Sequence, residues 1–287
     1  MQVVSSRSDV RAAVAAARRD GLRVALVPTM GYLHDGHLAL VDRARELADW
    51  VAMSIFVNPL QFGPSEDLDR YPRDLERDAA LASARGVDLL FAPTRAEMYP
   101  GGEPWVAVIP EHGADRLCGA SRPRHFRGVL TVVAKLLGIF APDVAVFGQK
   151  DFQQATLIRR MAADLDLGVD IEVVPTVREP DGLALSSRNV YLTNGDRERA
   201  LALSRALEGC RSLFAAGEVD AEVLRALLRR SLSTEGIELE YADVVDPETL
   251  QPQIRVGRGT VCAVAARVGG TRLIDNVVLA GISADPA

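Results

Sequence analysis

The sequence contains few cysteines, and they lie far apart. Only Cys118, Cys210 and Cys262 are cysteines among its 287 residues. An odd number of widely spaced cysteines predicts neither a disulfide framework nor a zinc site, and it is typical of a reducing compartment. We therefore expect a cytoplasmic protein.

The chain also lacks long apolar runs and an excess of positive charge. No run approaches the roughly 20 apolar residues that cross a bilayer, and the N-terminus has no signal-peptide-like apolar core. The formal net charge is −6, and the sequence pI is near 5.4. These features argue against a membrane or a nucleic acid as partner.

Two common phosphate-binding patterns are missing as well. The sequence has no Gly-x-x-x-x-Gly-Lys-Ser/Thr loop and no Gly-x-Gly-x-x-Gly fingerprint. Neither P-loop hydrolysis nor dinucleotide binding is therefore favoured. The remaining composition, 48% hydrophobic and 25% charged, is that of an ordinary soluble globular protein with room for two domains.

The stretch Pro28–His37 is the most informative part of the chain. A short apolar run at 24–27 precedes it, and an amphipathic run follows it from Leu38. A strand, a glycine-bearing turn and a helix in this order build nucleotide sites in α/β proteins. Gly31 and Gly36 would let the backbone approach a ligand closely. We expect this turn to hold the phosphates of ATP.

The first half of the chain alternates between helical and strand-like patterns. Buried strands at 23–27 and 51–57 flank the helix that follows the turn, which predicts a βαβ unit in a parallel sheet. Further strands are expected at 87–91, 105–109, 143–147 and 171–174, and further helices at 9–20, 75–84 and 129–140. We predict a Rossmann-like α/β domain over residues 1–176, with ligands beyond the carboxyl ends of its strands.

The second half begins with a polar linker that contains Pro180 and Gly182. Helices are expected at 196–216 and 221–233, followed by short, antiparallel strands at 238–245, 259–268 and 272–275. Residues 177–287 are therefore predicted to form a smaller α+β domain, a lid or a dimerisation domain.

His34 and His37 suggest either a metal site or phosphate chemistry. Zinc would need a third protein ligand nearby, and the other histidines, His112 and His125, lie in irregular sequence. Zinc is thus disfavoured. Histidines at a helix N-terminus can instead donate hydrogen bonds to a transferring phosphoryl group, each worth on the order of 2.7–4 kcal/mol when deleted.

Other polar groups allow two interpretations each. Lys150 follows a strand and precedes a helix, where it can bind phosphate, although most lysines are simply exposed. Ser186-Ser187-Arg188 can bind phosphate but is a common tripeptide. Asn58 and Gln61 read slightly better as loop residues than as substrate ligands. The basic stretch 122–127 is either a solvated loop or an anion clamp. None of these groups supplies a nucleophile, so the attacking atom must come from a substrate.

Two motifs resemble those of a known superfamily. His34-Asp35-Gly36-His37 resembles the His-x-Gly-His signature of nucleotidyltransferases and class I aminoacyl-tRNA synthetases, and 185–188 resembles their Lys-Met-Ser-Lys-Ser motif. More specifically, the chain resembles the pantoate–β-alanine ligase family, also called pantothenate synthetases. The segments that carry this resemblance are 28–37, 58–62, 71–73, 125–129, 147–154, 181–189 and 271–276.

The resemblance implies a two-step ligation that uses ATP and Mg²⁺. The carboxylate of pantoate attacks the α-phosphorus of ATP, which releases pyrophosphate and leaves a bound pantoyl adenylate. The amine of β-alanine then attacks the acyl carbon, and AMP leaves. The family pattern makes His37 a proton donor, although phosphoryl transfer mainly needs charge stabilisation and positioning. The resemblance also implies a homodimer.

The resemblance assigns functional residues position by position. The implied catalytic residues are His34, His37, Lys150 and Arg188. The implied ATP-binding residues are Met30, Gly31, Tyr32, Leu33, His34, Asp35, Gly36, His37, Gly148, Gln149, Lys150, Asp151, Val177, Leu185, Ser186, Ser187 and Arg188. The implied ligands of pantoate and β-alanine are Gln61 and Gln154, with Arg122 and His125 as further anion-binding groups. The protein ligands of Mg²⁺ stay unknown, with Asp78 as a guess.

Three positions depart from the family pattern. Leu185 stands where the family usually has Met, Gln149 where it has Glu, and Asp35 where it often has Glu. None of these changes removes a group that the mechanism requires, so we expect an active enzyme. The alternatives are an adenylate-forming ligase for another small acid, or a nucleotide-binding regulator without catalysis.

Overall fold

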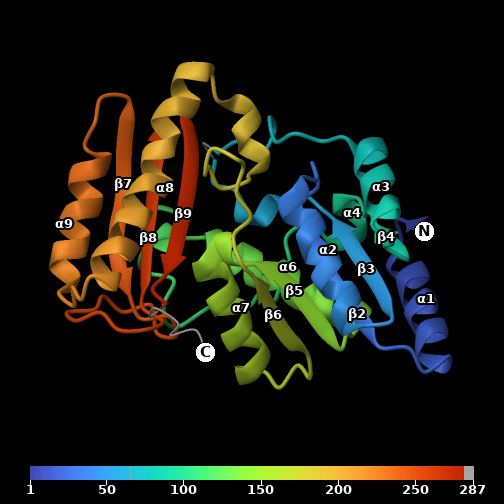
Figure 1. The fold of residues 1–287 in the computed structure, drawn as a ribbon. Coiled ribbons are helices and arrows are strands. Elements are labelled where there is room, and N and C mark those ends of the chain that lie inside the picture. The colour runs from blue at the N-terminus through green and yellow to red at the C-terminus, as the bar shows by residue number, and fades with distance from the viewer. Residues whose placement is uncertain (65, 281–287) are drawn as a thin grey trace, which may run out of the picture. The chain divides into compact units, whose positions relative to one another are not determined.

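The computed structural model describes residues 1–64 and 66–280 (Figure 1). By its internal contacts the chain forms two compact units. The first comprises residues 1–111, 122–149 and 157–177, and the second comprises 112–121, 150–156 and the chain from Arg178 onward. The second unit thus includes two short segments from before the predicted boundary at 176, and that boundary stays a prediction.

The first unit contains a parallel sheet of six strands in the order β1-β4-β3-β2-β5-β6. Its strands are β1 (Gln2–Val4), β2 (Val24–Thr29), β3 (Trp50–Ile55), β4 (Leu89–Phe91), β5 (Val144–Gly148) and β6 (Asp170–Val174). This confirms the predicted Rossmann-like α/β fold. Of these strands only β1 is not predicted by the sequence, because three residues are too few to show a periodicity.

Helices connect these strands. They are α1 (Arg7–Arg19), α2 (Asp35–Leu47), α3 (Leu75–Ala84), α4 (Arg95–Met98), α6 (His125–Phe140) and α7 (Phe152–Asp164), with a 3₁₀ turn η1 (Pro59–Gln61). Helix α2 buries Leu38, Leu40, Val41 and Ala44 against the sheet. Because β2 and β3 are apolar and buried along most of their length, they form the centre of this core.

The strand predicted at 105–109 is wrong. These residues belong to no strand, and Trp105 and Val106 are fully or largely exposed. A β-strand is stabilised by pairing with a neighbour, and this segment has no strand beside it within the described residues.

The strand order of the sheet reverses at β2. From β2 the chain builds β3 and β4 on one side, and β5 and β6 lie on the other. Parallel α/β sheets bind ligands in the crevice outside the carboxyl ends of the strands at such a switch point. The turn after Thr29 and the segment after Gly148 both leave the sheet at this position.

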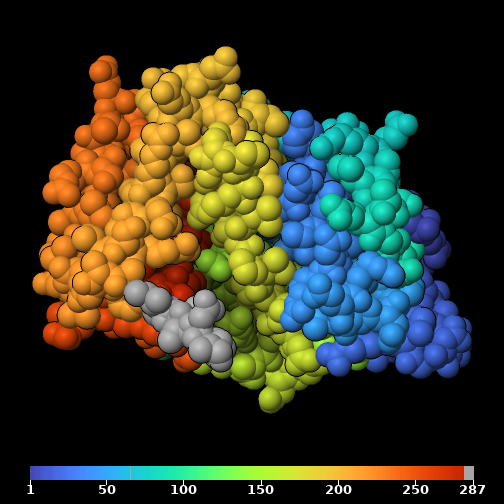
Figure 2. Space-filling model, in the orientation of Figure 1, coloured from blue at the N-terminus to red at the C-terminus, as the bar shows by residue number. Residues whose placement is uncertain are grey.

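The second unit contains an antiparallel sheet in the order β7-β8-β9. Its strands are β7 (Ile237–Val245), β8 (Val261–Val268) and β9 (Thr271–Val278), and its elements also include α5 (Cys118–Ser121), η3 (Ser187–Tyr191), α8 (Asn194–Ala215) and α9 (Ala221–Leu232). The short turn η2 (Gln149–Asp151) begins with Gln149 of the first unit and continues with Lys150 and Asp151 of the second. Helices α8 and α9 pack on this sheet over a continuous apolar core. Their atoms lie in front of the strands in the space-filling view (Figure 2). The predicted α+β character is confirmed.

Candidate active site

The turn after β2 uses its own backbone amides to hold itself in place. Gly31 and Tyr32 adopt left-handed conformations in succession, with φ angles of 83° and 50°. The N–H of Gly31 donates to Thr29 Oγ1 at 3.2 Å. The next two N–H groups donate to Asp78, from Tyr32 to Oδ2 at 2.6 Å and from Leu33 to Oδ1 at 2.7 Å. These three amides therefore already donate hydrogen bonds within the protein. They are not available to phosphate, so the predicted phosphate-binding role falls to the residues after Leu33.

The surroundings of Asp78 argue against the suggested role of this residue as a ligand of Mg²⁺. Its side chain is 1% exposed, and each of its carboxylate oxygens already accepts an amide of the turn. Burial raises the pKa of Asp78, and the amides of Leu33 and Tyr32 together with the charge of Arg77 oppose that rise. The guanidinium of Arg77 also lies over the Tyr32 ring, 5.2 Å from its centre. Asp78 is thus a structural anchor of the turn.

His34 and His37 form the start of helix α2. The N–H of His34, the N-cap residue, donates to Nδ1 of His37 at 3.3 Å, and the two ring centres lie 4.0 Å apart. An Nδ1 atom that accepts a hydrogen bond carries no proton, so the proton of the neutral His37 ring lies on Nε2. His37 is therefore set up as an Nε2–H donor at the positive end of a helix dipole.

Gln61 is oriented by its neighbours from three elements. Asn58 caps η1, and its Nδ2 donates to Gln61 Oε1 and to the carbonyl oxygen of Gly128 in α6, both at 3.1 Å. Gln61 Nε2 approaches Met30 Sδ at 3.1 Å. The buried hydroxyl of Tyr99, whose pKa is raised by burial, donates to Asn58 Oδ1 at 2.9 Å. The Gln61 amide is thereby held in one orientation beside the turn.

Arg122 and His125 hold the main chain of Gln61 in place. His125 Nδ1 donates to the carbonyl oxygen of Gln61 at 2.9 Å, and Arg122 donates to the same oxygen at 3.2 Å. Arg122 also forms an ion pair with Glu66, with Nε to Oε1 at 2.7 Å. Burial raises the pKa of Glu66, but the hydrogen bond and charge of Arg122 outweigh this and lower it overall. Direct substrate binding by Arg122 and His125 stays a prediction.

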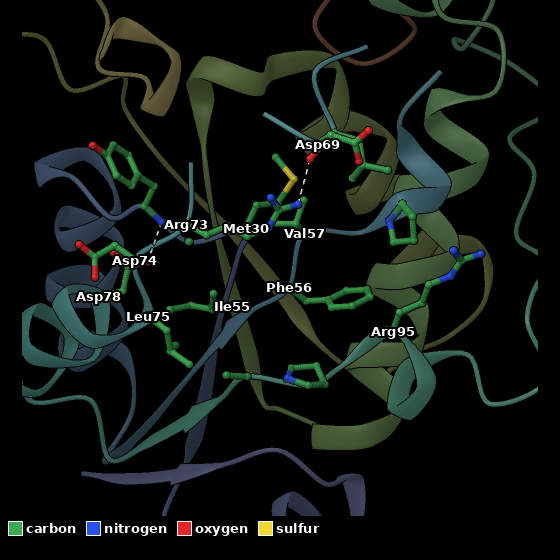
Figure 3. Close-up of a pocket in the computed structure, with 16 residues that line it drawn as sticks. Met30, Ile55, Phe56, Val57, Asp69, Arg73, Asp74, Leu75, Asp78 and Arg95 are labelled. Carbon is green, nitrogen blue, oxygen red and sulfur yellow. Dashed lines mark hydrogen bonds between the residues drawn. The ribbon is translucent and has the colours of Figure 1, made fainter. Parts of the chain in front are cut away.

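A cavity of about 430 Å³ borders the turn within the first unit (Figure 3). Met30 from the turn and Phe56 from the segment after β3 line it. Arg73 lines it as well, and its guanidinium donates to the carbonyl oxygens of Leu68 and Tyr71 at 2.9 and 3.1 Å. Its volume lies within the range of small-molecule sites, about 300–1,000 Å³.

The remaining predicted groups divide between the two units. Gly148, Gln149 and Val177 belong to the first unit, and Lys150, Asp151, Gln154 and the stretch Leu185–Arg188 belong to the second. Within the second unit, Ser186 Oγ caps η3 by accepting the N–H of Arg188 at 3.3 Å, and Ser187 is buried. The sequence-predicted residues are therefore distributed over both units, and their roles stay predictions.

Sequence reasoning missed three supporting residues. Asp78 appeared only as a metal guess, and Asn58 and Tyr99 were given no orienting role. The Asn-Pro pair at 58–59 is a recognisable cap for a short helix, so Asn58 carried a usable signal. Asp78 and Tyr99 carried none, because their partners lie 46 and 41 residues away in the sequence.

Within the described residues, no group of three or more His, Cys, Asp and Glu side chains is placed to hold a metal ion. No helix of the described chain is long and apolar enough to cross a bilayer. A Rossmann-like sheet whose polar residues gather where the strand order reverses is the architecture of nucleotide-binding α/β enzymes.

Comparison with known proteins defines the class more narrowly. The family model described as pantoate–β-alanine ligase matches residues 2–278. A protein named pantothenate synthetase 1 from Bradyrhizobium diazoefficiens is 54% identical over 280 residues, which cover 97% of this chain and 98% of that protein. A pantothenate synthetase from Pelotomaculum thermopropionicum is 52% identical, with 97% and 99% covered.

Solved structures agree with this assignment. The pantothenate synthetase of Thermus thermophilus superimposes with a TM-score of 0.92 at 47% identity, covering 98% of this chain and all of that one. A pantoate–β-alanine ligase from Francisella tularensis, complexed with an ATP species and β-alanine, gives 0.80 at 33% identity, with 97% of each chain covered. The chain belongs to the pantoate–β-alanine ligase family.

Proposed function

We propose that this enzyme joins pantoate to β-alanine with ATP, through a pantoyl adenylate. The observation that carries the proposal is the His34–His37 pair, held at the start of α2 beyond the carboxyl end of β2. The pair lies where the strand order of the sheet reverses. The chain also belongs to a family that is named for this ligation.

In the first step a carboxylate oxygen of pantoate bonds to the α-phosphorus of ATP. The bond from that phosphorus to the bridging oxygen breaks, and pyrophosphate leaves with the negative charge. His37 donates its Nε2–H to the phosphoryl oxygens, and His34, Lys150 and Arg188 share the charge that develops. Fixed donors of this kind stabilise the transition state without reorganising, so no proton transfer from His37 is needed.

In the second step the neutral amine of β-alanine bonds to the acyl carbon of the adenylate. The bond from that carbon to the phosphate oxygen breaks, AMP leaves as an anion, and the amine proton passes to solvent. The enzyme contributes positioning here, because holding two reactants in line converts a bimolecular reaction into an effectively unimolecular one.

We assign the nucleotide to the predicted ATP-binding residues. In the first unit these are Met30, Gly31, Tyr32, Leu33, His34, Asp35, Gly36, His37, Gly148, Gln149 and Val177, and in the second they are Lys150, Asp151, Leu185, Ser186, Ser187 and Arg188. The contribution of residues 31–33 is confined to groups other than their amides. The first turn of α2 offers its dipole to phosphate.

Gln61 and Gln154 are assigned to pantoate, because neutral amides suit its hydroxyl groups. The fixed orientation of the Gln61 amide supports this role. Arg122 and His125 are assigned as further anion-binding groups for the substrates, and they also hold the carbonyl oxygen of Gln61.

Mg²⁺ enters with the nucleotide, as Mg-ATP. Magnesium is commonly held by substrate phosphates and water with few protein ligands. The oxygens of Asp78 are already occupied by amides, so that residue does not suit the ion.

We also propose a homodimer in the cytoplasm. The exposed apolar side chains of Trp105, Val106 and Ile109 offer a surface for a second copy. The three cysteines are free thiols, as in a reducing compartment, and cell fractionation checks the location.

Pyrophosphate release from ATP, Mg²⁺ and pantoate, without β-alanine, tests the chemistry. Wild-type enzyme should release pyrophosphate in a burst, and His37→Ala or Lys150→Ala should slow that burst by about 100-fold or more. His112→Ala is the control, since this exposed histidine lies outside the predicted site, and it should keep the wild-type rate.

Other outcomes would contradict the proposal. Release with another hydroxy acid but not with pantoate would identify a different ligase. ATP binding without any release would leave a nucleotide-binding regulator. Wild-type rates in both variants would remove His37 and Lys150 from the mechanism.

A further inference from the structure

The segment Thr271–Asn276 on strand β9 belongs to the resemblance but has no assigned role. We infer that Asp275 and Asn276 are positioning residues for adenylate formation, which rests on the function proposed above. Asn276 fixes the backbone position of Lys150, and Asp275 fixes the position of the linker that carries Ser186–Arg188. All of these residues belong to the second unit.

Asn276 holds the main chain of Lys150. The Asn276 side chain is almost completely buried, and its Nδ2 donates to the carbonyl oxygen of Lys150 at 2.9 Å. Lys150 lies in η2, the short turn between β5 and α7. Fixing this carbonyl fixes the point from which the long lysine side chain extends. The bond is only partly buried, but its donor is a buried side chain, and a buried donor that loses its acceptor is costly, so the bond favours one backbone conformation at Lys150.

Asp275 holds the base of the linker. Its carboxylate binds the guanidinium of Arg178 with two hydrogen bonds, from Nη1 to Oδ2 at 2.7 Å and from Nη2 to Oδ1 at 3.0 Å. Arg178 Nη1 also donates to the carbonyl oxygen of Gly182 at 3.1 Å. Paired arginine–carboxylate bonds of this kind fix geometry as well as adding energy. Asp275 is 4% exposed, whereas the Arg178 side chain is 31% exposed, so the carboxylate side of the pair is shielded from water.

The linker transmits this anchoring to Ser186–Arg188. Arg178 and Ala184 form an isolated β-bridge. Asn189 Nδ2 donates to the carbonyl oxygen of Ala184 at 3.1 Å and to Glu179 Oε1 at 2.8 Å. These bonds link both ends of the segment 178–189, and η3 contacts β9 as well. A displacement of Arg178 is therefore carried to the serines and the arginine.

Adjacent positions on one strand explain how the pair serves both elements. Consecutive side chains of a β-strand point to opposite faces of the sheet. Leu273 and Val277 pack in the core beneath α8 and α9, which places Asp275 on that same face. Asn276 lies on the other face, the side on which Val278 packs near Phe152 at the start of α7. Strand β9 thus fixes two charge-bearing segments from different parts of the chain.

The test compares Asp275→Asn and Asn276→Ala with a matched control. Glu240→Gln also removes a carboxylate from a two-bond arginine pair of the same sheet, with Arg272 at 2.7 and 2.8 Å, and that pair involves neither Lys150 nor Arg178. We expect the two test variants to slow the pyrophosphate burst by about tenfold or more, because small displacements of positioned groups cost rate steeply. Glu240→Gln should lower the melting temperature and keep the burst rate and the KM for β-alanine.

Double variants separate positioning from a general loss of stability. If Asn276 acts through Lys150, adding Asn276→Ala to Lys150→Ala should cause less than about a twofold further loss, because coupled residues are not additive. Asp275→Asn should behave in the same way in an Arg188→Ala background. If the rate losses of the two single variants simply multiplied in both double variants, the residues would act independently, and the inference would be overturned. If Asn276→Ala fails to fold, Asn276→Ser replaces it, since serine keeps a polar group but is too short to reach the carbonyl.

Hydrogen exchange gives a readout that does not depend on activity. Asp275→Asn should speed amide exchange across residues 178–189, and Glu240→Gln should not. Unchanged exchange together with unchanged burst rates would refute the positioning role. If wild-type enzyme released no pyrophosphate while the exchange result held, the proposed function would fail and the structural coupling would stand.

Discussion

Gly31 is the residue on which the turn after β2 most depends. Its φ of 83° is disfavoured for residues with a side chain, and an added Cβ would lie 2.8 Å from Ile55 Cγ2 and 3.0 Å from Asp78 Oδ2. Two constraints therefore coincide here: a left-handed backbone and a close approach of the residues that hold the turn.

Gly31→Ala should destabilise the protein more than a left-handed conformation alone does. Gly21→Ala is the matched control, because Gly21 has a φ of 74° and nothing within 4 Å of the added Cβ. The control should cost about 1–2 kcal/mol of unfolding free energy from conformation, and Gly31→Ala about 1–3 kcal/mol more from crowding. Denaturant titration measures both. Equal losses in the two variants would show that Ile55 and Asp78 move aside freely.

At the scale of elements, the contact between α6 and η1 decides where Gln61 lies. Gly128 faces η1 so closely that a Cβ there would be 2.2 Å from the carbonyl oxygen of Leu60. The glycine in the segment 125–129 therefore has a physical purpose. It lets the helix backbone approach the turn that carries Gln61.

Gly128→Ala should push α6 away from η1 and displace Gln61. We expect a loss of about 1–3 kcal/mol in stability from overpacking and a higher KM for pantoate with an unchanged KM for ATP. Gly138→Ala lies on the same helix with nothing within 4 Å of its Cβ, so it should stabilise by about 0.5–1 kcal/mol through helix propensity. An unchanged KM for pantoate in Gly128→Ala would show that Gln61 does not bind that substrate.

At the scale of the whole molecule, the exposed segment 105–109 predicts self-association. Trp105, Val106 and Ile109 are 101%, 85% and 61% exposed. Burying a large apolar side chain is worth about 1.5–3 kcal/mol. A symmetric contact buries each side chain twice, so this segment can contribute substantially to a dimer.

Sedimentation velocity checks this prediction. Wild-type protein should sediment as a dimer, and the double variant Trp105→Ser, Ile109→Ser should raise the dissociation constant by about 100-fold or more, equivalent to about 3 kcal/mol. Ile254→Ser is the control, because Ile254 is similarly exposed, at 86%, outside this segment. A monomeric wild type, or a shift of equal size in the control, would reject the surface.

The order and kind of the main elements followed from the sequence because they are written in local patterns. Apolar runs such as 24–27, and the helical spacing after Leu38, report burial directly through their periods. The segment 105–109 misled for the same reason. Its apolar residues look like a strand, but a strand also requires a partner that local pattern does not reveal.

The sequence by itself determined that His34 and His37 meet, because residues three apart at the start of one helix lie close together. Only the tertiary structure decided what holds them. Asp78 meets Leu33 across a sequence separation of 45, and Asn276 meets Lys150 across one of 126. Such pairs are set by the packing of whole elements and by the need to satisfy every buried polar group. The structure therefore assigned the amides of Tyr32 and Leu33 to a buried carboxylate, where the turn pattern alone indicated phosphate.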